Sequence, residues 1–275
     1  MLRRMCVSLT ALAIAAAPAL TLLATSGTAS AAPAAHVAVA HGAIRNGGVD
    51  VHAATPGSKP LRTHGGVFNA STTSTNWSGY AAHGGTYTTV SATWVQPTGS
   101  CTSATRYSSF WVGLDGYTSN SVEQTGTDTD CSGGRPVYYG WYEMYPNPSF
   151  SFGSTIHAGD TISASVSFSG TSSYTLKLSD VTRGWTSTTT KSLSGAPRSS
   201  AEVIIEAPCC TGGGGILPLA NFGTVHLSNS LVNGSSIGSF SPDQITMINN
   251  SGADKDTVSA LSGGTSFSAT WVRAS

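Results

Sequence analysis

The chain contains one aromatic run that predicts its architecture: Val137-Tyr138-Tyr139-Gly140-Trp141-Tyr142-Glu143-Met144-Tyr145. Successive side chains of a β-strand point to opposite faces, so Trp141, Glu143 and Tyr145 share one face of a strand over 137–145. The other face carries Tyr138, Gly140, Tyr142 and Met144. An acidic side chain between aromatic rings on one face indicates a groove.

A second informative strand is predicted at 200–206, with the sequence Ser200-Ala201-Glu202-Val203-Ile204-Ile205-Glu206. Here Glu202, Ile204 and Glu206 share one face, and three apolar side chains occupy the other. Burying two carboxylates on an otherwise apolar strand costs free energy unless they find partners. Either this face is solvated or the two glutamates have a function, and the pattern alone leaves both interpretations open.

Short alternating segments separated by Gly, Ser, Asn and Pro continue on both sides of these two strands. No segment shows the 3.6-residue period of a helix over a convincing length. Ten or more short strands in about 200 residues predict an all-β fold, one antiparallel β-sandwich of two sheets. We expect strands at 87–95, 107–114, 121–127, 137–145, 161–168, 174–178, 200–206, 222–227, 244–248 and 266–272, and a further one at 76–82.

Charged residues are scarce in this 275-residue chain. They make up 9% of it, with 13 Lys and Arg against 13 Asp and Glu, where about 25% is usual. Beyond the extreme N-terminus no basic run occurs, and phosphate binding requires a clustered basic footprint. The composition therefore excludes a nucleic-acid partner, and it leaves few charges to perform any chemistry.

Residues 1–31 have the features of a secretory signal peptide. Arg3 and Arg4 precede an apolar stretch that Pro18 interrupts, and small residues at 29–31 provide a cleavage site. A membrane anchor would require roughly 20 uninterrupted apolar residues. We expect a secreted, extracellular protein with no membrane association after cleavage of the signal.

Residues 32–70 differ in composition from the rest and are predicted to be a propeptide or a linker. Three basic residues stand against one acid there, and four histidines gain charge below a pKa near ~6.5. The remaining segment, 71–275, is predicted to be the catalytic β-sandwich domain and carries 8 Lys and Arg against 12 Asp and Glu. Opposite charges would hold the two segments together until acid neutralises the carboxylates.

Four cysteines remain after the leader, Cys101, Cys131, Cys209 and Cys210. An even number in an oxidising compartment predicts two disulfides. Of the three possible pairings we favour Cys101 with Cys131, which leaves either a vicinal bridge or two free thiols at 209–210. Ligand pairs with zinc spacing are absent from the sequence, so we expect no metal and no cofactor.

Two motifs with catalytic associations have simpler explanations. Gly234-Ser235-Ser236-Ile237-Gly238 matches the GxSxG nucleophile motif, which requires a strand leading into a helix; no helix is predicted there, so we interpret it as a loop. The glycine run 212–215 lacks the Lys-Ser/Thr of a phosphate loop. The histidines of the predicted domain, His83, His157 and His226, are scattered and receive no role.

Six motifs, taken in order, resemble the glutamic peptidases of family G1, the eqolisins. The resemblance covers residues 76 to about 230. Its motifs are Asn76-Trp77-Ser78-Gly79-Tyr80, Trp111-Val112-Gly113-Leu114-Asp115-Gly116, Glu123-Gln124-Thr125-Gly126-Thr127-Asp128, Trp141-Tyr142-Glu143-Met144-Tyr145-Pro146, Ser200-Ala201-Glu202-Val203-Ile204-Ile205-Glu206-Ala207-Pro208 and Ala220-Asn221-Phe222-Gly223-Thr224-Val225.

This resemblance implies a secreted, acid-active endopeptidase with a concanavalin-like jelly roll and a catalytic glutamine/glutamate dyad. Gln124 matches the family's glutamine, and Glu206 is preferred to Glu202 for the glutamate because it stands at the end of its strand. Tyr139 departs from the pattern, because fungal members carry an acid there. The implied groove and supporting positions are Trp77, Trp111, Asp115, Trp141, Glu143 and Tyr145. Implied partners are protein or peptide substrates, and we expect a monomer.

The residues themselves allow an assignment of roles. Glu206 can take a proton from a water and return it to the leaving nitrogen, while the amide of Gln124 stabilises the oxyanion. Such a glutamate should titrate within a unit or two of ~4.3 unless burial dominates, which places activity in acid.

Two other functions stay open on the residues alone. A glycoside hydrolase could use Glu143 and Glu206 as its two carboxylates. A non-catalytic carbohydrate-binding module could use Trp77, Trp111 and Trp141 as stacking platforms.

Overall fold

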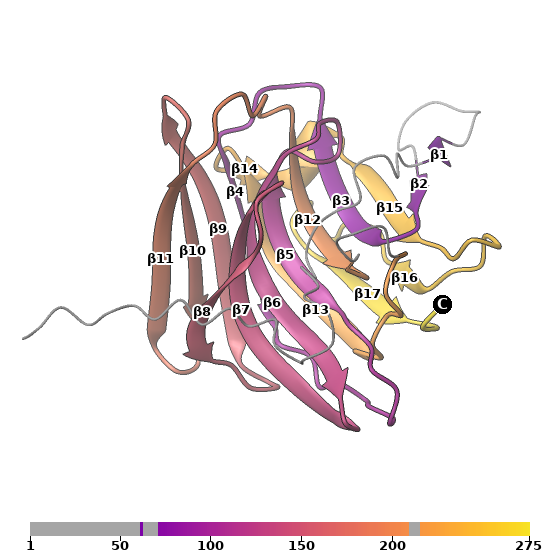
Figure 1. Ribbon diagram of the computed structural model, residues 1–275. Helices are drawn as coiled ribbons and strands as arrows, with labels where there is room; N and C mark the ends of the chain where they lie inside the picture. Colours follow the sequence, from indigo (N-terminus) through magenta and orange to yellow (C-terminus); the bar gives the residue numbers. More distant parts are fainter. Residues whose placement is uncertain (1–60, 63–70, 209–214) are drawn as a thin grey trace, which may run out of the picture. The chain divides into compact units, whose positions relative to one another are not determined.

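The computed structural model describes residues 61–62, 71–208 and 215–275, which form two β-sheets (Figure 1). Besides strands, the described residues contain one turn of 3-10 helix, η1 (Ile237–Phe240). The expected signal peptide, nearly all of the 32–70 segment, and Cys209 with Cys210 lie outside the described residues.

The larger sheet has nine strands in the order β1-β2-β15-β3-β12-β5-β6-β7-β8. All neighbours are antiparallel except β2 and β15, which run parallel. Its strands are β1 (Leu61–Arg62), β2 (Ser71–Ser74), β3 (Trp77–His83), β5 (Ser109–Leu114), β6 (Val122–Ser132), β7 (Arg135–Tyr145), β8 (Phe150–Thr155), β12 (Ser200–Glu206) and β15 (Asp243–Met247).

The smaller sheet has eight strands, of which seven follow the order β11-β10-β9-β4-β13-β17-β16, while β14 pairs with β13. Its strands are β4 (Thr89–Val95), β9 (Thr161–Gly170), β10 (Ser173–Asp180), β11 (Trp185–Ser192), β13 (Thr224–Val232), β14 (Ser235–Ser236), β16 (Asp256–Val258) and β17 (Phe267–Trp271). The predicted all-β sandwich is confirmed.

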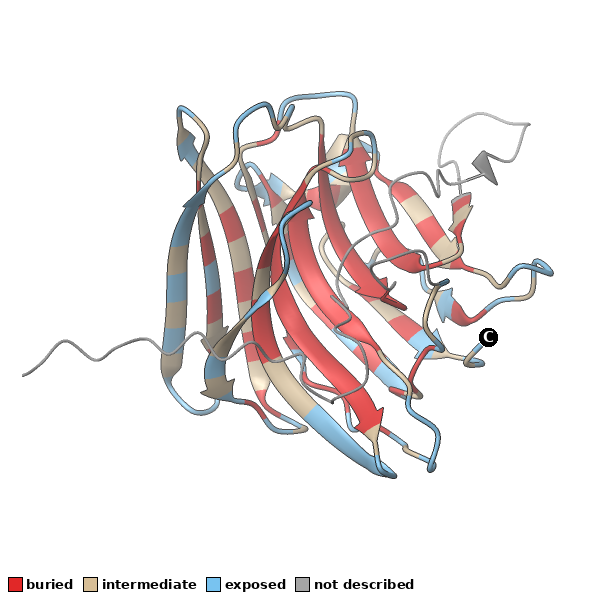
Figure 2. Ribbon diagram, in the orientation of Figure 1, coloured by how far each residue is buried: buried red, intermediate tan, exposed pale blue. Residues whose placement is uncertain are grey.

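The main core lies between the two sheets and takes one face of each strand. On β12 this face carries Ala201, Val203 and Ile205, and on β5 it carries Phe110 and Val112. Figure 2 shows the central strands β3, β12, β5 and β6 buried along almost their whole length, while β9 and β10 alternate. The central strands of the larger sheet are therefore covered on both faces, and the smaller sheet on one.

All ten predicted strands are present, with ends that differ by up to five residues, and the additional strand expected at 76–82 is β3. The predictions missed six strands of the described residues, β1, β2, β8, β11, β14 and β16. β11 consists mostly of threonine and serine, and exposed hydroxyls such as that of Thr190 pair with hydroxyls of β10, so it shows no apolar alternation.

The interpretation of the GxSxG motif as a loop was wrong in part. Its serines form β14, and η1 follows immediately. The Ser236 hydroxyl donates a hydrogen bond to the carbonyl oxygen of Gly264 at 2.8 Å. A backbone acceptor thus engages this hydroxyl, which is not the arrangement of an activated nucleophile.

The predicted Cys101–Cys131 disulfide is confirmed, with the two Cα atoms 5.4 Å apart. It joins the segment before β5 to the far end of β6. Within the described ranges we find no helix of the length and apolarity needed to cross a bilayer.

Candidate active site

The chain has four glutamates in total, and all four are buried: Glu123, Glu143, Glu202 and Glu206 are each at most 1% exposed. Glutamate is almost never fully buried without a partner. The alternative that the glutamate face of β12 is solvated is therefore wrong. Burying a carboxyl group costs free energy, and this chain buries all of its glutamates in the larger sheet. Such a concentration of buried carboxyl groups is typical of functional sites.

Three of these glutamates lie on the face of the larger sheet that points away from the main core. A second apolar cluster covers this face, and its largest members are Trp77, Trp111 and Trp141. As predicted from the period of two, Glu143 shares its face with Trp141 and Tyr145, and Glu206 shares its face with Ile204. We call this surface the tryptophan face.

Gln124 lies on the tryptophan face of β6, directly opposite Glu143 of β7. Its amide nitrogen Nε2 donates a hydrogen bond of 2.7 Å to Oε2 of Glu143. Because a carboxylate oxygen can only accept, this bond fixes which end of the amide carries the NH2 group. Glu143 thus orients Gln124, a role that the sequence alone did not assign to it.

Glu206 is the last residue of β12 and is fully buried. Its Oε2 accepts a hydrogen bond of 2.8 Å from Nε1 of Trp111, and its Oε1 accepts one of 3.3 Å from Nδ2 of Asn76. Burial raises the pKa of Glu206 to about 8, against the opposing effect of these donors. The expectation of a pKa near 4.3 carried the condition that burial does not dominate, and here burial dominates.

Trp111 connects the regions of Gln124 and Glu206. A Cβ on Gly113 would lie 2.8 Å from Cζ3 of Trp111 and 3.3 Å from Cβ of Gln124. The six-membered ring therefore reaches over Gly113 toward Gln124, while the nitrogen at the other end of the indole binds Glu206. A Cβ on Gly126 would clash with the carbonyl oxygen of Phe110 and lie 2.6 Å from Cβ of Trp111, so Gly113 makes room for the ring and Gly126 for the strand that carries it.

Glu202 has different surroundings. The strand register puts it level with Gln124, with only Gly113 between them. Its Oε1 accepts a long hydrogen bond of 3.4 Å from the backbone nitrogen of Tyr117. Burial raises the pKa of Glu202 well above its usual range, and the carboxyl of Asp115 adds to this effect.

An acidic cluster that the sequence analysis missed lies farther along the same face. The hydroxyl of Tyr139 lies 2.8 Å from Oδ2 of Asp128 and 2.8 Å from Oδ2 of Asp130. One hydroxyl hydrogen can serve only one of these acceptors. Burial raises the pKa of both acids, that of Asp130 to about 7. Below neutral pH a protonated carboxyl group therefore supplies the second hydrogen that the three side chains need.

A model of the Peptidase A4 family matches residues 75–271. The chain belongs to this family. The resemblance to the eqolisins carried by the six sequence motifs is thereby confirmed.

Known members show the same relation in sequence and in fold. Scytalidopepsin B of Scytalidium lignicola is 37% identical over 140 residues, 49% of this chain and 52% of that protein. Aspergillopepsin-2 of Aspergillus niger is 33% identical over 129 residues, 44% of each chain. The matched segment thus spans about half the length of these curated relatives.

Two crystal structures of family members superpose on the described fold. Scytalido-glutamic peptidase with a transition state analog inhibitor gives a TM-score of 0.64 at 31% identity, covering 72% of this chain and 98% of that chain. SCP-B, an eqolisin in complex with the tripeptide Ala-Ile-His, gives a TM-score of 0.60 at 29% identity with the same coverage.

The other positions that the family resemblance assigned to the groove divide into two groups. Trp77, Trp141 and Tyr145 belong to the tryptophan face, where Nε1 of Trp141 donates a 2.6 Å hydrogen bond to Asp128. Asp115 instead joins two loops, because its carboxylate accepts hydrogen bonds from the backbone nitrogens of Arg198 and Ser199 at 2.7 and 2.8 Å. Direct contact of these residues with substrate stays a prediction.

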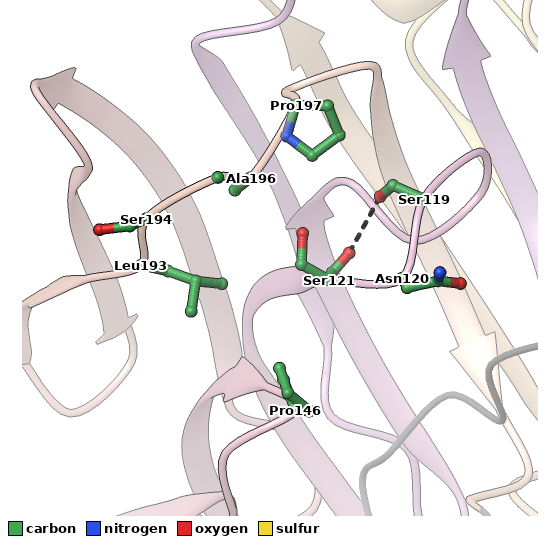
Figure 3. A pocket seen from close by; sticks show the side chains of 9 residues that line it. Ser119, Asn120, Ser121, Pro146, Leu193, Ser194, Ala196 and Pro197 are labelled. Atoms are coloured by element: carbon green, nitrogen blue, oxygen red, sulfur yellow. Dashed lines mark hydrogen bonds between the residues drawn. The ribbon is translucent and has the colours of Figure 1, made fainter.

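A cavity of about 420 Å³ opens at the end of β6 and β7 nearest Gln124 and Glu143. Figure 3 shows the loop at 119–121 on one side of it and the segment at 193–197 on the other. Its described lining is uncharged, in contrast to the acidic tryptophan face. No group of three or more His, Cys, Asp or Glu side chains within 61–62, 71–208 and 215–275 is arranged to hold a metal ion.

Proposed function

We propose that this chain is an acid-active endopeptidase that hydrolyses peptide bonds in proteins, with Glu206 and Gln124 as its catalytic dyad. The observation that carries the proposal is the position of Trp111, which binds the carboxyl of Glu206 at one end and reaches toward Gln124 at the other. Membership of the Peptidase A4 family supports it, as does the peptide bound to the relative SCP-B.

The raised pKa of Glu206 favours the protonated carboxyl as the starting state in acid. In the first step one carboxyl oxygen donates its proton to the oxygen of the scissile carbonyl, while the other accepts a proton from the attacking water. The new C–O bond converts the amide to a neutral gem-diol, and Glu206 ends the step protonated. Glu206 therefore acts as both base and acid.

The second step uses the same carboxyl. Glu206 gives its proton to the leaving nitrogen and accepts one from a gem-diol hydroxyl as the C–N bond breaks. The products are a carboxylic acid and an amine, and Glu206 is again protonated.

Gln124 acts on the oxygen of the scissile carbonyl, which carries partial negative charge in the first step until the proton of Glu206 reaches it. Its NH2 group has two hydrogens, one of which binds Glu143 in this structure, and an amide hydrogen directed at the developing oxyanion lowers the barrier. Glu143 keeps the amide in the orientation that allows this. Removing Glu143 should therefore act through Gln124.

The groups around Glu143 disfavour the glycosidase alternative. A glycosidase would need Glu143 as its second carboxylate, but Oε2 of Glu143 accepts the hydrogen bond that orients Gln124, and the family to which the chain belongs is a peptidase family. Similarly, a carbohydrate-binding module exposes its stacking rings, whereas Trp111 and Trp141 are at most 1% exposed. Neither alternative accounts for a buried glutamine whose amide is bound by the glutamate of the neighbouring strand.

We also propose a secreted precursor with a signal peptide at 1–31, a propeptide at 32–70 and a catalytic domain at 71–275. The basic charge of 32–70 opposes the acidic charge of 71–275. Separately produced residues 32–70 should inhibit the mature enzyme near neutral pH and release it in acid. An inhibition constant that ignores pH and salt would contradict this electrostatic mechanism.

The experiment that tests the proposed function compares substrates. The purified mature protein should cleave denatured protein in acid, insensitive to a pepstatin-type inhibitor of aspartic peptidases, and should leave soluble polysaccharides intact. Polysaccharide hydrolysis without proteolysis would establish the glycosidase instead. Binding to polysaccharide without either activity would establish the binding module.

A further inference from the structure

Trp77 carries a hydrogen-bond donor without an acceptor. Its side chain is 6% exposed, and its Nε1 is buried with no hydrogen-bond partner among the described residues. Buried indole N–H groups normally have a partner. The unpaired N–H of Trp77 lies beside a carboxyl group that can change its protonation state. This arrangement points to an acceptor that binds the N–H in only one of the two protonation states.

Glu206 is the acceptor that stands opposite this donor. Trp77 and Glu206 are direct cross-strand partners on β3 and β12. A carboxylate offers about four lone-pair sites, and two hydrogen bonds reach Glu206, from Trp111 and Asn76. The Trp77 indole lies close enough to lower the pKa of Glu206, although it makes no hydrogen bond of ordinary geometry.

We infer that Nε1–H of Trp77 is a third donor to Glu206, which binds the carboxylate when this group is ionised and disengages when it is protonated. Trp77 is then a positioning residue that favours the ionised state of Glu206. The inference deepens the proposed function and rests on it for its catalytic meaning.

The packing of Trp77 restricts movement at one end of the indole more than at the other. A Cβ on Gly116 would lie 2.9 Å from Cη2 of Trp77 and 2.5 Å from Cγ2 of Val122. The six-membered ring of Trp77 thus packs closely against Gly116. The ring of Trp111 packs edge-on against Trp77, with the two ring centroids 5.0 Å apart. A small rotation about this fixed end moves the nitrogen.

Charged groups on the neighbouring elements do not compete for this role. On the same face, β12 carries Glu202 four residues away, and β6 carries Asp128, separated from Glu206 by Ser109 of β5. Behind Asn76, the buried ammonium of Lys255 lies 3.4 Å from the carbonyl oxygen of Thr75. Burial raises the pKa of Glu206, the N–H groups of Trp111, Trp77 and Asn76 lower it, and no charged group contributes to the shift.

Because the chain has only four glutamates, the ionisation of Glu206 can be followed directly. Protein labelled with carbon-13 at the glutamate side-chain carboxyl should give four carbon resonances, and Glu206→Gln identifies the one of interest. Loss of a donor to the ionised form must raise the pKa. Replacing Trp77 with Phe, or with 3-benzothienylalanine, which keeps the ring shape but has no N–H, should raise the pKa of Glu206 by about one unit.

The matched control is Trp271→Phe, which removes an indole N–H that donates to Leu219 at 3.3 Å in another part of the molecule. It should leave the Glu206 titration unmoved. An unchanged or lowered pKa in both Trp77 variants would overturn the inference. A shift with Phe but not with benzothienylalanine would also overturn it, because ring packing would then be the cause.

Activity separates this inference from the proposed function. If the wild-type protein hydrolyses protein, the basic limb of its kcat/KM profile should move upward in both Trp77 variants by the shift seen in the titration. If it hydrolyses no protein, the proposed function fails, while the carbon-13 titration still decides whether Trp77 donates to Glu206.

Discussion

The outer faces of the two sheets use opposite chemistry. On the larger sheet the outer face buries Glu143, Glu202, Glu206 and Asp128 among indole rings. On the smaller sheet it presents rows of hydroxyl groups, as in β9, where serines alternate with buried apolar residues. Cross-strand hydroxyl contacts link these rows, such as Thr175 with Thr190, Ser179 with Thr186, and Thr224 with Thr270.

This difference has a physical reason in acid. Serine and threonine hydroxyls solvate a surface without changing charge with pH, whereas carboxylates lose their charge as pH falls. Between the two outer faces, the carboxylates are concentrated on the tryptophan face, where protonation of Glu206 is part of the proposed chemistry. The hydroxyl face solvates the molecule at any pH, so substitutions on the two faces should have very different consequences.

The largest effect is expected from Glu206→Gln, which keeps the size of the side chain but can neither take nor give the catalytic proton. It should lower kcat by about 10³-fold or more while leaving the circular dichroism spectrum unchanged. Glu202→Gln serves as the matched control on the same strand and face and should retain most of the turnover. A folded Glu206→Gln enzyme with near-normal turnover, beside an inactive Glu202→Gln enzyme, would transfer the catalytic role to Glu202.

Gln124→Ala should lower kcat by about 10²-fold or more, because it removes the donor to the oxyanion. Glu143→Gln keeps a hydrogen-bond acceptor but loses the charge that orients the amide, so its loss should be smaller, about tenfold, and appear in kcat rather than KM. Steady-state kinetics on one peptide substrate measures both. A larger loss in Glu143→Gln than in Gln124→Ala would contradict the positioning role and show that Glu143 acts on the substrate itself.

The free energy of unfolding should fall as pH rises. This effect is smaller than the losses of kcat above, and it originates in buried glutamates of the larger sheet. Burial raises the pKa of Glu123 from 4.5 to about 9, and that of Glu206 to about 8. Because the folded state favours the protonated forms, their contribution is complete below pH 4.5 and is lost progressively up to pH 8 and 9. Within this window each group lowers the free energy of unfolding by at most about 1.4 kcal/mol per pH unit.

Thermal unfolding between pH 4 and pH 9 measures this dependence, and Glu123→Gln tests its origin. A neutral amide does not titrate, so the variant should show a flatter decline of Tm with pH than the wild-type protein. Both oxygens of Glu123 lack hydrogen bonds to any residue that the structure describes, and Glu123 faces the main core, away from the proposed dyad. A variant whose Tm declines as steeply as that of the wild type would assign the effect to other groups.

The smallest effect is expected on the hydroxyl face. Thr188 is exposed on β11 and lies opposite Lys177 of β10. Thr188→Glu adds a titratable group there, and the free energy of unfolding should change by no more than about 0.5 kcal/mol, with kcat unchanged. A large loss of activity would contradict the separation of the two faces.

The sequence predicted the fold well where strands have one apolar face. The strand at 200–206 is predicted to the residue, and the faces of 137–145 are correct. It failed at β11, where threonine and serine fill the exposed positions and hide the period.

The sequence singled out Gln124, Glu143 and Glu206, which the structure places on one face of the larger sheet, but not their contacts, and their catalytic roles stay predictions. Glu143 appeared as a groove residue, and the structure shows it holding Gln124. Asn76 was quoted only as part of a motif, although it binds Glu206. Such contacts join strands that are distant in sequence, and a period of two says which face a residue occupies but not which neighbour it meets. Burial likewise decided the pKa of Glu206, and burial is a property of the assembled sheet.

The pH dependence of kcat/KM tests most directly whether the protonated carboxyl of Glu206 performs the proton transfers. The purified mature enzyme should be assayed on one peptide substrate from pH 2 to pH 10, with a pepstatin-type inhibitor and a serine-directed reagent in parallel. We predict that kcat/KM is highest in acid, falls as Glu206 ionises with a limit near pH 8, and is unaffected by either reagent. A profile that peaks above pH 8, or inactivation by the serine reagent, would contradict the account.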